Sequence, residues 1–213
     1  MSQPPTGSRL RAQFGDIDIY LFDQILRGRF DTRTRVLDAG CGDGRNLIYL
    51  LQNGYTCYGV DSEPDAIRRM REVAAAVNPA VPADHFVVAD VDRLPYGDGS
   101  MQAVICSAVL HFAMDEAHFG RMVVEMWRVL AVGGLFFARL ASNIGLEREV
   151  GPAGRVVYLP DGSQRFIVDE AMLLQWTARL GARLCDPIKT TNVQQQRCMT
   201  TWCLIKEPAS TAG

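Results

Sequence analysis

The stretch Val36-Leu-Asp-Ala-Gly-Cys-Gly-Asp-Gly-Arg-Asn46 decides the fold class of this chain. Its first residues form a short apolar run typical of a buried strand, and a turn rich in glycine follows at once. The glycines at 40, 42 and 44 permit backbone dihedral angles that other residues avoid and let the backbone approach a ligand closely. The residues after the turn are expected to open a helix, whose first amide groups are unpaired. A strand, a glycine turn and a helix in this order predict a pocket for a nucleotide cofactor.

Two classes of cofactor bind at such a turn, and the spacing of the glycines distinguishes them. A dinucleotide site has the pattern G-x-G-x-x-G, in which the third glycine allows close packing around a pyrophosphate. Here Arg45 stands at the position of that third glycine, and Asp38 places a carboxylate before the first one. A carboxylate there repels a pyrophosphate and attracts the ammonium group of S-adenosylmethionine. A second acid, Asp61, follows the strand-like run 55–60 and could accept hydrogen bonds from the ribose hydroxyls of either cofactor.

Strand-like and helix-like segments alternate along the chain, which predicts a doubly wound α/β fold with helices on both faces of a parallel sheet. Strands are expected near 35–39, 55–60, 85–89, 101–106, 134–140, 182–187 and 197–206. Helices are expected over 16–30, 63–77, 119–130 and 169–180. The length and the apolar content of 48% predict one domain over residues 1–213.

The glycine turn and three later segments resemble the class I S-adenosylmethionine-dependent methyltransferases, a Rossmann-like family, over about residues 16–206. The three segments are 87–95, 101–112 and 129–137, which look like the third strand, the fourth strand with its active-site segment, and the fifth strand of that family. Two shorter stretches, 44–55 and 199–206, are similar to small-molecule enzymes of the tellurite-resistance type. The resemblance implies a mostly parallel seven-stranded sheet whose last strand is antiparallel.

The same resemblance implies S-adenosylmethionine as the methyl donor, S-adenosylhomocysteine as the product, and a set of residues that bind them. Asp38 is expected near the methionine end of the donor, Asp61 on the ribose hydroxyls and Asp90 at the adenine edge. The full expected set is Asp38, Gly40, Cys41, Gly42, Asp61, Ser62, Asp90, Val91 and Ser107.

Methyl transfer from a sulfonium is an in-line displacement, for which alignment of the reactants and exclusion of water matter most. A general base helps only when the acceptor atom carries a proton. His111, just after the fourth expected strand, is the first candidate for that base, and packing within its own turn is the alternative. Tyr20 could close over the cofactor, or it could belong to the core. Arg139 and Arg148 could recognise a carboxylate or another oxyanion of the acceptor, and solvation at the surface is the alternative for Arg148.

The segment 141–165 interrupts the alternation of strands and helices. It contains too many glycines and prolines for one regular element. It also follows the carboxyl end of a strand, where ligands bind in open α/β sheets. We therefore expect a substrate lid here, with an ordinary surface loop as the alternative.

Composition narrows the range of partners. The chain has 22 basic and 24 acidic side chains, a net charge of −2, and no basic cluster of the kind that binds nucleic acid. No apolar run reaches the length of a membrane span and the start is polar, so we expect a cytoplasmic protein with no membrane partner. None of the six cysteines has C-x-x-C spacing, and no metal is expected. A thiol-based site among Cys185, Cys198 and Cys203 stays open.

These patterns favour an enzyme that transfers a methyl group from S-adenosylmethionine to a small molecule, whose identity the sequence does not reveal. A sensor or regulatory subunit that binds the donor without catalysis is the alternative, because an intact pocket shows only that the donor can bind. An NAD-dependent oxidoreductase is disfavoured by Asp38 and by the missing third glycine. The sequence leaves the oligomeric state open.

Overall fold

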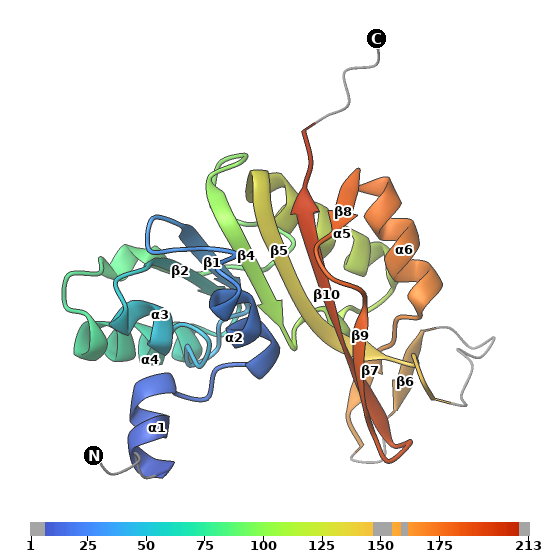
Figure 1. Cartoon of the computed structure of the whole chain (residues 1–213), viewed down its shortest axis with the longest axis horizontal. Helices are drawn as coiled ribbons and strands as arrows, with labels where there is room; N and C mark the ends of the chain where they lie inside the picture. Colours follow the sequence, from blue (N-terminus) through green and yellow to red (C-terminus); the bar gives the residue numbers. More distant parts are fainter. Residues whose placement is uncertain (1–6, 147–154, 159–161, 209–213) are drawn as a thin grey trace.

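The computed structural model describes residues 7–146, 155–158 and 162–208, and shows a sheet with helices on both faces (Figure 1). The helices are α1 Gly7–Phe14, α2 Ile19–Leu26, α3 Ile48–Gln52, α4 Pro64–Val77, α5 Glu116–Val129 and α6 Glu170–Arg179. The strands are β1 Arg35–Ala39, β2 Thr56–Asp61, β3 Phe86–Val88, β4 Met101–Ser107, β5 Leu130–Ser142, β6 Val156–Tyr158, β7 Gln164–Phe166, β8 Ala182–Leu184, β9 Lys189–Val193 and β10 Arg197–Lys206. Two short 3-10 helices cover Ala83–His85 and Leu110–Phe112.

The main sheet has eight strands in the order β3-β2-β1-β4-β5-β10-β8, with β9 paired to β10. The neighbours from β3 to β5 are parallel, so their carboxyl ends lie at one edge. Strand β10 is antiparallel to β5 and to β8, which confirms the expected α/β fold with an antiparallel last strand. Strand order reverses between β1 and β4, the place where such sheets bind ligands. Strand β9 was not expected, because its sequence Lys-Thr-Thr-Asn-Val lacks an apolar run.

Successive residues of the central strands pack on opposite faces of the sheet, as the period of two for a strand requires. Val36 of β1 belongs to the apolar cluster that includes residues of α2, α3 and α4, whereas Leu37 belongs to the cluster that includes residues of α5 and α6. Strand β4 likewise sends Ile105 to the first cluster and Val104 to the second. Burial on both faces explains why the sequence of β4 is apolar almost throughout.

The N-terminal region differs from the single helix expected over 16–30. Helix α2 begins only at Ile19, because Asp18 has extended backbone angles and its Oδ1 accepts a hydrogen bond from the Tyr20 backbone N–H at 2.9 Å. It ends at Leu26, and Gly28 follows with φ +67°, a conformation typical of a helix terminus. A separate helix, α1, precedes this cap.

The expected insertion 141–165 is partly described. It contains the end of β5 and a hairpin in which β6 pairs antiparallel with β7. Figure 1 shows this hairpin near the end of the sheet where β5 stops and β10 starts. Residues 147–154 and 159–161, Arg148 among them, lie outside the described residues, so a mobile lid stays a prediction. Within the described ranges, no helix is both long and apolar enough to cross a membrane.

Candidate functional site

A first cavity, of about 1030 Å³, opens at the carboxyl ends of β1, β2, β3 and β4. Among its lining residues are eight of the nine positions expected to bind a cofactor: Gly40, Cys41, Gly42, Asp61, Ser62, Asp90, Val91 and Ser107. They come from four segments of the sequence, and the strand order brings those segments together because each follows a different strand of the parallel set.

The glycine turn after β1 forms one wall of this cavity, and two of its glycines are needed for different reasons. Gly40 has φ +80°, and a Cβ there would collide with the side chain of Val109. Gly42 has φ +52°, but a Cβ there would meet no atom within 4 Å. The backbone at Gly42 therefore borders open space, where a ligand can approach it closely.

Asp61 joins the glycine turn to the end of β2. Its Oδ2 accepts a hydrogen bond from the backbone N–H of Gly42 at 2.8 Å, and its Oδ1 accepts one from the N–H of Glu63 at 3.0 Å. Each carboxylate oxygen has more than one lone pair, so hydroxyl donors of a ligand can still bind. Asp61 thus shapes the turn and offers acceptors to the cavity at the same time.

Asp38 is the one expected cofactor residue that does not line the first cavity. It lies in β1 with 1% of its surface exposed, and neither carboxylate oxygen has a hydrogen-bond partner within the described residues. Burial raises the pKa of Asp38 to about 7, although the Arg45 charge and the Asn46 amide oppose this shift. A buried carboxylate without hydrogen bonds is costly for folding, so its position just before the glycine turn indicates a functional role.

A second cavity, of about 500 Å³, adjoins the first, and Ala108 and Phe112 line both. Ala108 has φ +65°, an uncommon conformation for a residue with a side chain. Its backbone N–H donates to the Arg139 carbonyl at 2.7 Å, which holds it against β5. Strained residues of this kind concentrate at functional sites, and this one lies at the boundary between the two cavities.

Of the residues expected to act on an acceptor, His111 and Arg139 line the second cavity. His111 is 6% exposed, and its Nδ1 has no hydrogen-bond partner in the described part of the chain. Burial and the Arg165 charge lower the pKa of His111 to about 4, so the ring is neutral at pH 7 but is a weak base.

Tyr20 lines neither of these two cavities and instead packs against a buried apolar cluster, which is the alternative that the sequence left open for it. Its hydroxyl is hydrogen-bonded to Thr191 Oγ1 at 2.6 Å, which ties α2 to β9. The Arg139 guanidinium lies 4.9 Å from the centre of its ring. Tyr20 therefore packs behind Arg139, and Arg148 lies outside the described residues.

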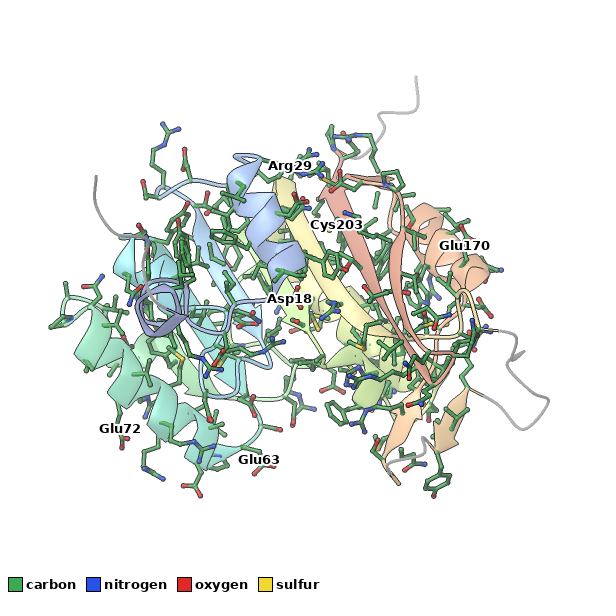
Figure 2. All side chains as sticks on the ribbon, turned by 60° about the horizontal axis from the view of Figure 1, so that its bottom comes forward. Asp18, Arg29, Glu63, Glu72, Glu170 and Cys203 are labelled. Atoms are coloured by element: carbon green, nitrogen blue, oxygen red, sulfur yellow. The ribbon has the colours of Figure 1, made fainter. Side chains whose placement is uncertain are left out.

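Sequence reasoning missed Asp18, which connects the walls of the two cavities. Figure 2 shows Asp18 at the start of α2, near the middle of the molecule. Its side chain is fully buried, and Oδ2 accepts hydrogen bonds from Ser107 Oγ at 3.2 Å and from Arg139 Nη1 at 3.0 Å. Arg45 Nη2 in turn donates to Ser107 Oγ at 2.9 Å. This network joins two residues of the first cavity to Arg139 of the second.

Two of the three C-terminal cysteines are neighbours, and only the third lines the second cavity. Cys198 lines the second cavity, whereas the Cys185 backbone N–H donates to the Cys203 carbonyl at 2.8 Å next to the β8–β10 pair. Burial raises the pKa of the Cys203 thiol, which keeps it protonated. Among the described residues there is no cluster of three or more metal-binding side chains. The thiol-based site that the sequence left open therefore has no geometric support there.

Comparison with known sequences gives a partial match. Residues 36–134 match a family model described as a methyltransferase domain. An uncharacterized methyltransferase of Synechocystis sp. is 36% identical over 102 residues, which are 48% of this chain and 44% of that protein. The chain thus spans about half or less of the length of the first curated relatives that it matches.

Two solved structures share the fold at low sequence identity. The 1,6-didemethyltoxoflavin-N1-methyltransferase of Burkholderia thailandensis, with 1,6-didemethyltoxoflavin and S-adenosylhomocysteine bound, is 17% identical with a TM-score of 0.69, over 98% of this chain and 94% of that chain. The [4+2]-cyclase SpnF is also 17% identical with a TM-score of 0.69, over 88% and 81%. Proteins with different reactions share this fold, so the site has to decide the function.

Proposed function

We infer, from the match of residues 36–134 to a methyltransferase domain model, that this protein transfers a methyl group from S-adenosylmethionine to a small-molecule acceptor. The chain has the class I S-adenosylmethionine-dependent methyltransferase fold. One observation carries the proposal, namely that the two cavities meet at Ala108 and Phe112. A donor in the first cavity and an acceptor in the second would share a boundary where the methyl group can pass.

The chemistry of the first cavity supports S-adenosylmethionine over a dinucleotide. Asp61 offers carboxylate oxygens for ribose hydroxyls, and Asp90 and Val91, which we assign to the adenine edge, line the same cavity. Gly42 leaves room for close approach to the backbone. Asp38 brings a carboxylate without hydrogen bonds to the same turn, which favours a nearby ammonium group over a pyrophosphate.

When bound, S-adenosylmethionine supplies an electrophilic methyl group that an in-line displacement moves to an acceptor lone pair, leaving S-adenosylhomocysteine. Ala108 and Phe112 line both cavities, so they would lie between the two reactants. His111 presents a neutral ring, so it can accept a hydrogen bond from an acceptor O–H or N–H. Because its pKa is low, we assign it to orienting the acceptor through this hydrogen bond, and any proton that the acceptor loses passes to solvent water.

Isothermal titration of the purified protein with S-adenosylhomocysteine and with NAD tests the choice of cofactor. Asp61→Ala should weaken S-adenosylhomocysteine binding about tenfold or more, because charge-assisted hydrogen bonds to the ribose are lost. Asp65→Ala removes an exposed carboxylate of α4 and is the matched control, with affinity unchanged within about twofold. Binding of NAD without binding of S-adenosylhomocysteine would overturn the proposal.

A donor-binding sensor without catalysis is the second candidate, and the low pKa of His111 favours it because a strong base is missing from that position. Donor carrying a labelled methyl group distinguishes the two functions. Label that moves into a small-molecule fraction supports methyl transfer. Tight binding of S-adenosylhomocysteine, with no labelled product from any acceptor mixture, supports the sensor.

A further inference from the structure

The second cavity is lined by cationic side chains without acidic ones, as far as the structure describes its walls. Arg139, Arg165 and Arg197 line it, and no aspartate or glutamate is among the described lining residues. Charges of one sign along a concave surface focus the electrostatic field and attract a ligand of the opposite charge. The cavity therefore has a positive potential that a neutral acceptor would not need.

Arg165 is a half-buried cation of this cavity, and most of its N–H donors have no hydrogen-bond partner among the described residues. It lies on β7, and its guanidinium lies 4.6 Å from the centre of the Phe112 ring, which lines both cavities. Its Nη1 donates to the neighbouring Gln164 carbonyl at 2.7 Å. Within residues 7–146, 155–158 and 162–208, no carboxylate pairs with it. A guanidinium has five N–H donors, so most of them are left for a ligand.

The other two arginines add charge in different ways. Arg139 uses Nη1 to bind Asp18, and its Nε is buried without a partner in the described residues. Arg197 is exposed at the start of β10 and has no carboxylate partner in the described part of the chain. Asp18 offsets one of the three charges, so the walls keep a net positive charge.

The remaining walls are largely apolar. Phe112, Leu146, Val157, Ile167 and Met199 contribute apolar side chains, and the volume of about 500 Å³ lies in the range that holds small organic ligands. An occupant of this cavity can thus bury a hydrophobic body while one end meets the arginines.

We propose that the acceptor is a small organic carboxylate with an apolar body, whose anionic group is bound by Arg165 and, at the outer rim, by Arg197. This inference rests on the proposed function, because it assigns the second cavity to the acceptor. The planar fork of Arg165 matches the two oxygens of a carboxylate, and its contact with Phe112 fixes the orientation of that fork. A carboxylate would satisfy a half-buried cation that the described residues leave without a counter-ion.

Four carboxylates and their uncharged primary amides test the proposal as matched probes: benzoate, phenylacetate, 4-hydroxybenzoate and octanoate. Each is titrated into the full chain with and without S-adenosylhomocysteine. At least one acid should bind about tenfold or more tightly than its amide. Arg165→Gln should remove that preference, while amide affinity stays within about twofold. Arg165→Lys should retain part of it, because the charge remains and the fork is lost.

Arg179→Gln is the matched control, because Arg179 also lies 4.6 Å from an aromatic ring, that of Trp176, but does not line the cavity. It should keep the full preference for acids. Absence of binding by every acid, equal binding of acids and amides, or a preference that survives Arg165→Gln would overturn the proposal. Failure to bind S-adenosylhomocysteine would instead contradict the proposed function, and it is measured separately.

Discussion

Replacing Asp38 with asparagine should change the way that folding stability depends on pH. Asp38 has a folded pKa of about 7 against an ordinary value of 3.8, because it is buried without hydrogen bonds from the described residues. Between these values the folded protein holds one more proton at this group than the unfolded chain does. The contribution of the protonated group to stability is therefore complete below pH 3.8 and is lost as the pH rises through 7. Asparagine does not ionise, so the variant avoids this loss.

The pKa shift of Asp38 sets the size of the effect. From pH 5 to pH 8 the loss integrates to about 3 kcal/mol. His111 acts in the opposite direction, because its lowered pKa of about 4 means that the unfolded chain binds the extra proton up to pH 6.5, and stability rises with pH there. Between pH 5 and pH 6.5, the loss of stability from Asp38 and the gain from His111 offset each other in the wild type. In Asp38→Asn only the rise in stability from His111 is left. Between pH 5 and pH 8 the free energy of unfolding of this variant should therefore increase by about 3 kcal/mol relative to the wild type.

Urea unfolding of the ligand-free protein across this pH range measures the free energy of unfolding. Asp31→Asn is the control, because Asp31 is exposed and Arg33 lowers its pKa, so that carboxylate is ionised in both states throughout the range. Its curve should run parallel to that of the wild type. If Asp38→Asn also ran parallel to the wild type from pH 5 to pH 8, Asp38 would be ionised in the folded protein and the reasoning would be refuted.

Three further substitutions test other parts of the site. His111→Gln should lose about 2 kcal/mol relative to the wild type between pH 5 and pH 8 in the same urea series, opposite in sign to Asp38→Asn. Asp18→Ala should lower the free energy of unfolding by about 2 to 3 kcal/mol, because the Arg139 charge loses its buried partner while remaining 22% exposed to water. Gly40→Ala should lower the free energy of unfolding by about 2 kcal/mol, because the positive φ and the Val109 side chain both oppose a Cβ. For a chain of this length, that loss lowers Tm by about 4 to 8 °C.

Each of these variants has a matched comparison. Asp16→Ala breaks an exposed ion pair with Arg11 and should leave the free energy of unfolding unchanged. If Asp18→Ala also left it unchanged, the result would argue against a stabilising buried network. Gly54→Ala has a similar φ of +78° but no neighbour within 4 Å, and should cost about 1 kcal/mol from backbone strain alone. Equal losses at the two glycines would contradict the steric role of Val109. A His111→Gln curve parallel to the wild type would show that the ring titrates normally.

The sequence by itself determined the parallel strands of the sheet and the main outline of the first cavity. Apolar runs of strand length, the glycine turn at 40–44 and acids at the ends of two strands are local patterns, so they can be recognised without knowing the rest of the chain. Parallel strands place their carboxyl ends at one edge, which is why Asp61 and Asp90 line one cavity. The predicted length of the N-terminal helix was wrong, and the reason is also local, because the prediction overlooked Asp18 as the residue that caps the start of α2.

Only the tertiary structure decided how the second cavity is built and how it meets the first. Asp18 is separated by 89 residues from Ser107 and by 121 from Arg139, and no periodic pattern connects positions so far apart. Arg165 becomes a wall of the cavity only because the β6–β7 hairpin folds back toward Phe112. Burial decides the protonation of Asp38 and His111, because a pKa depends on the surroundings that folding creates and not on the neighbours in sequence.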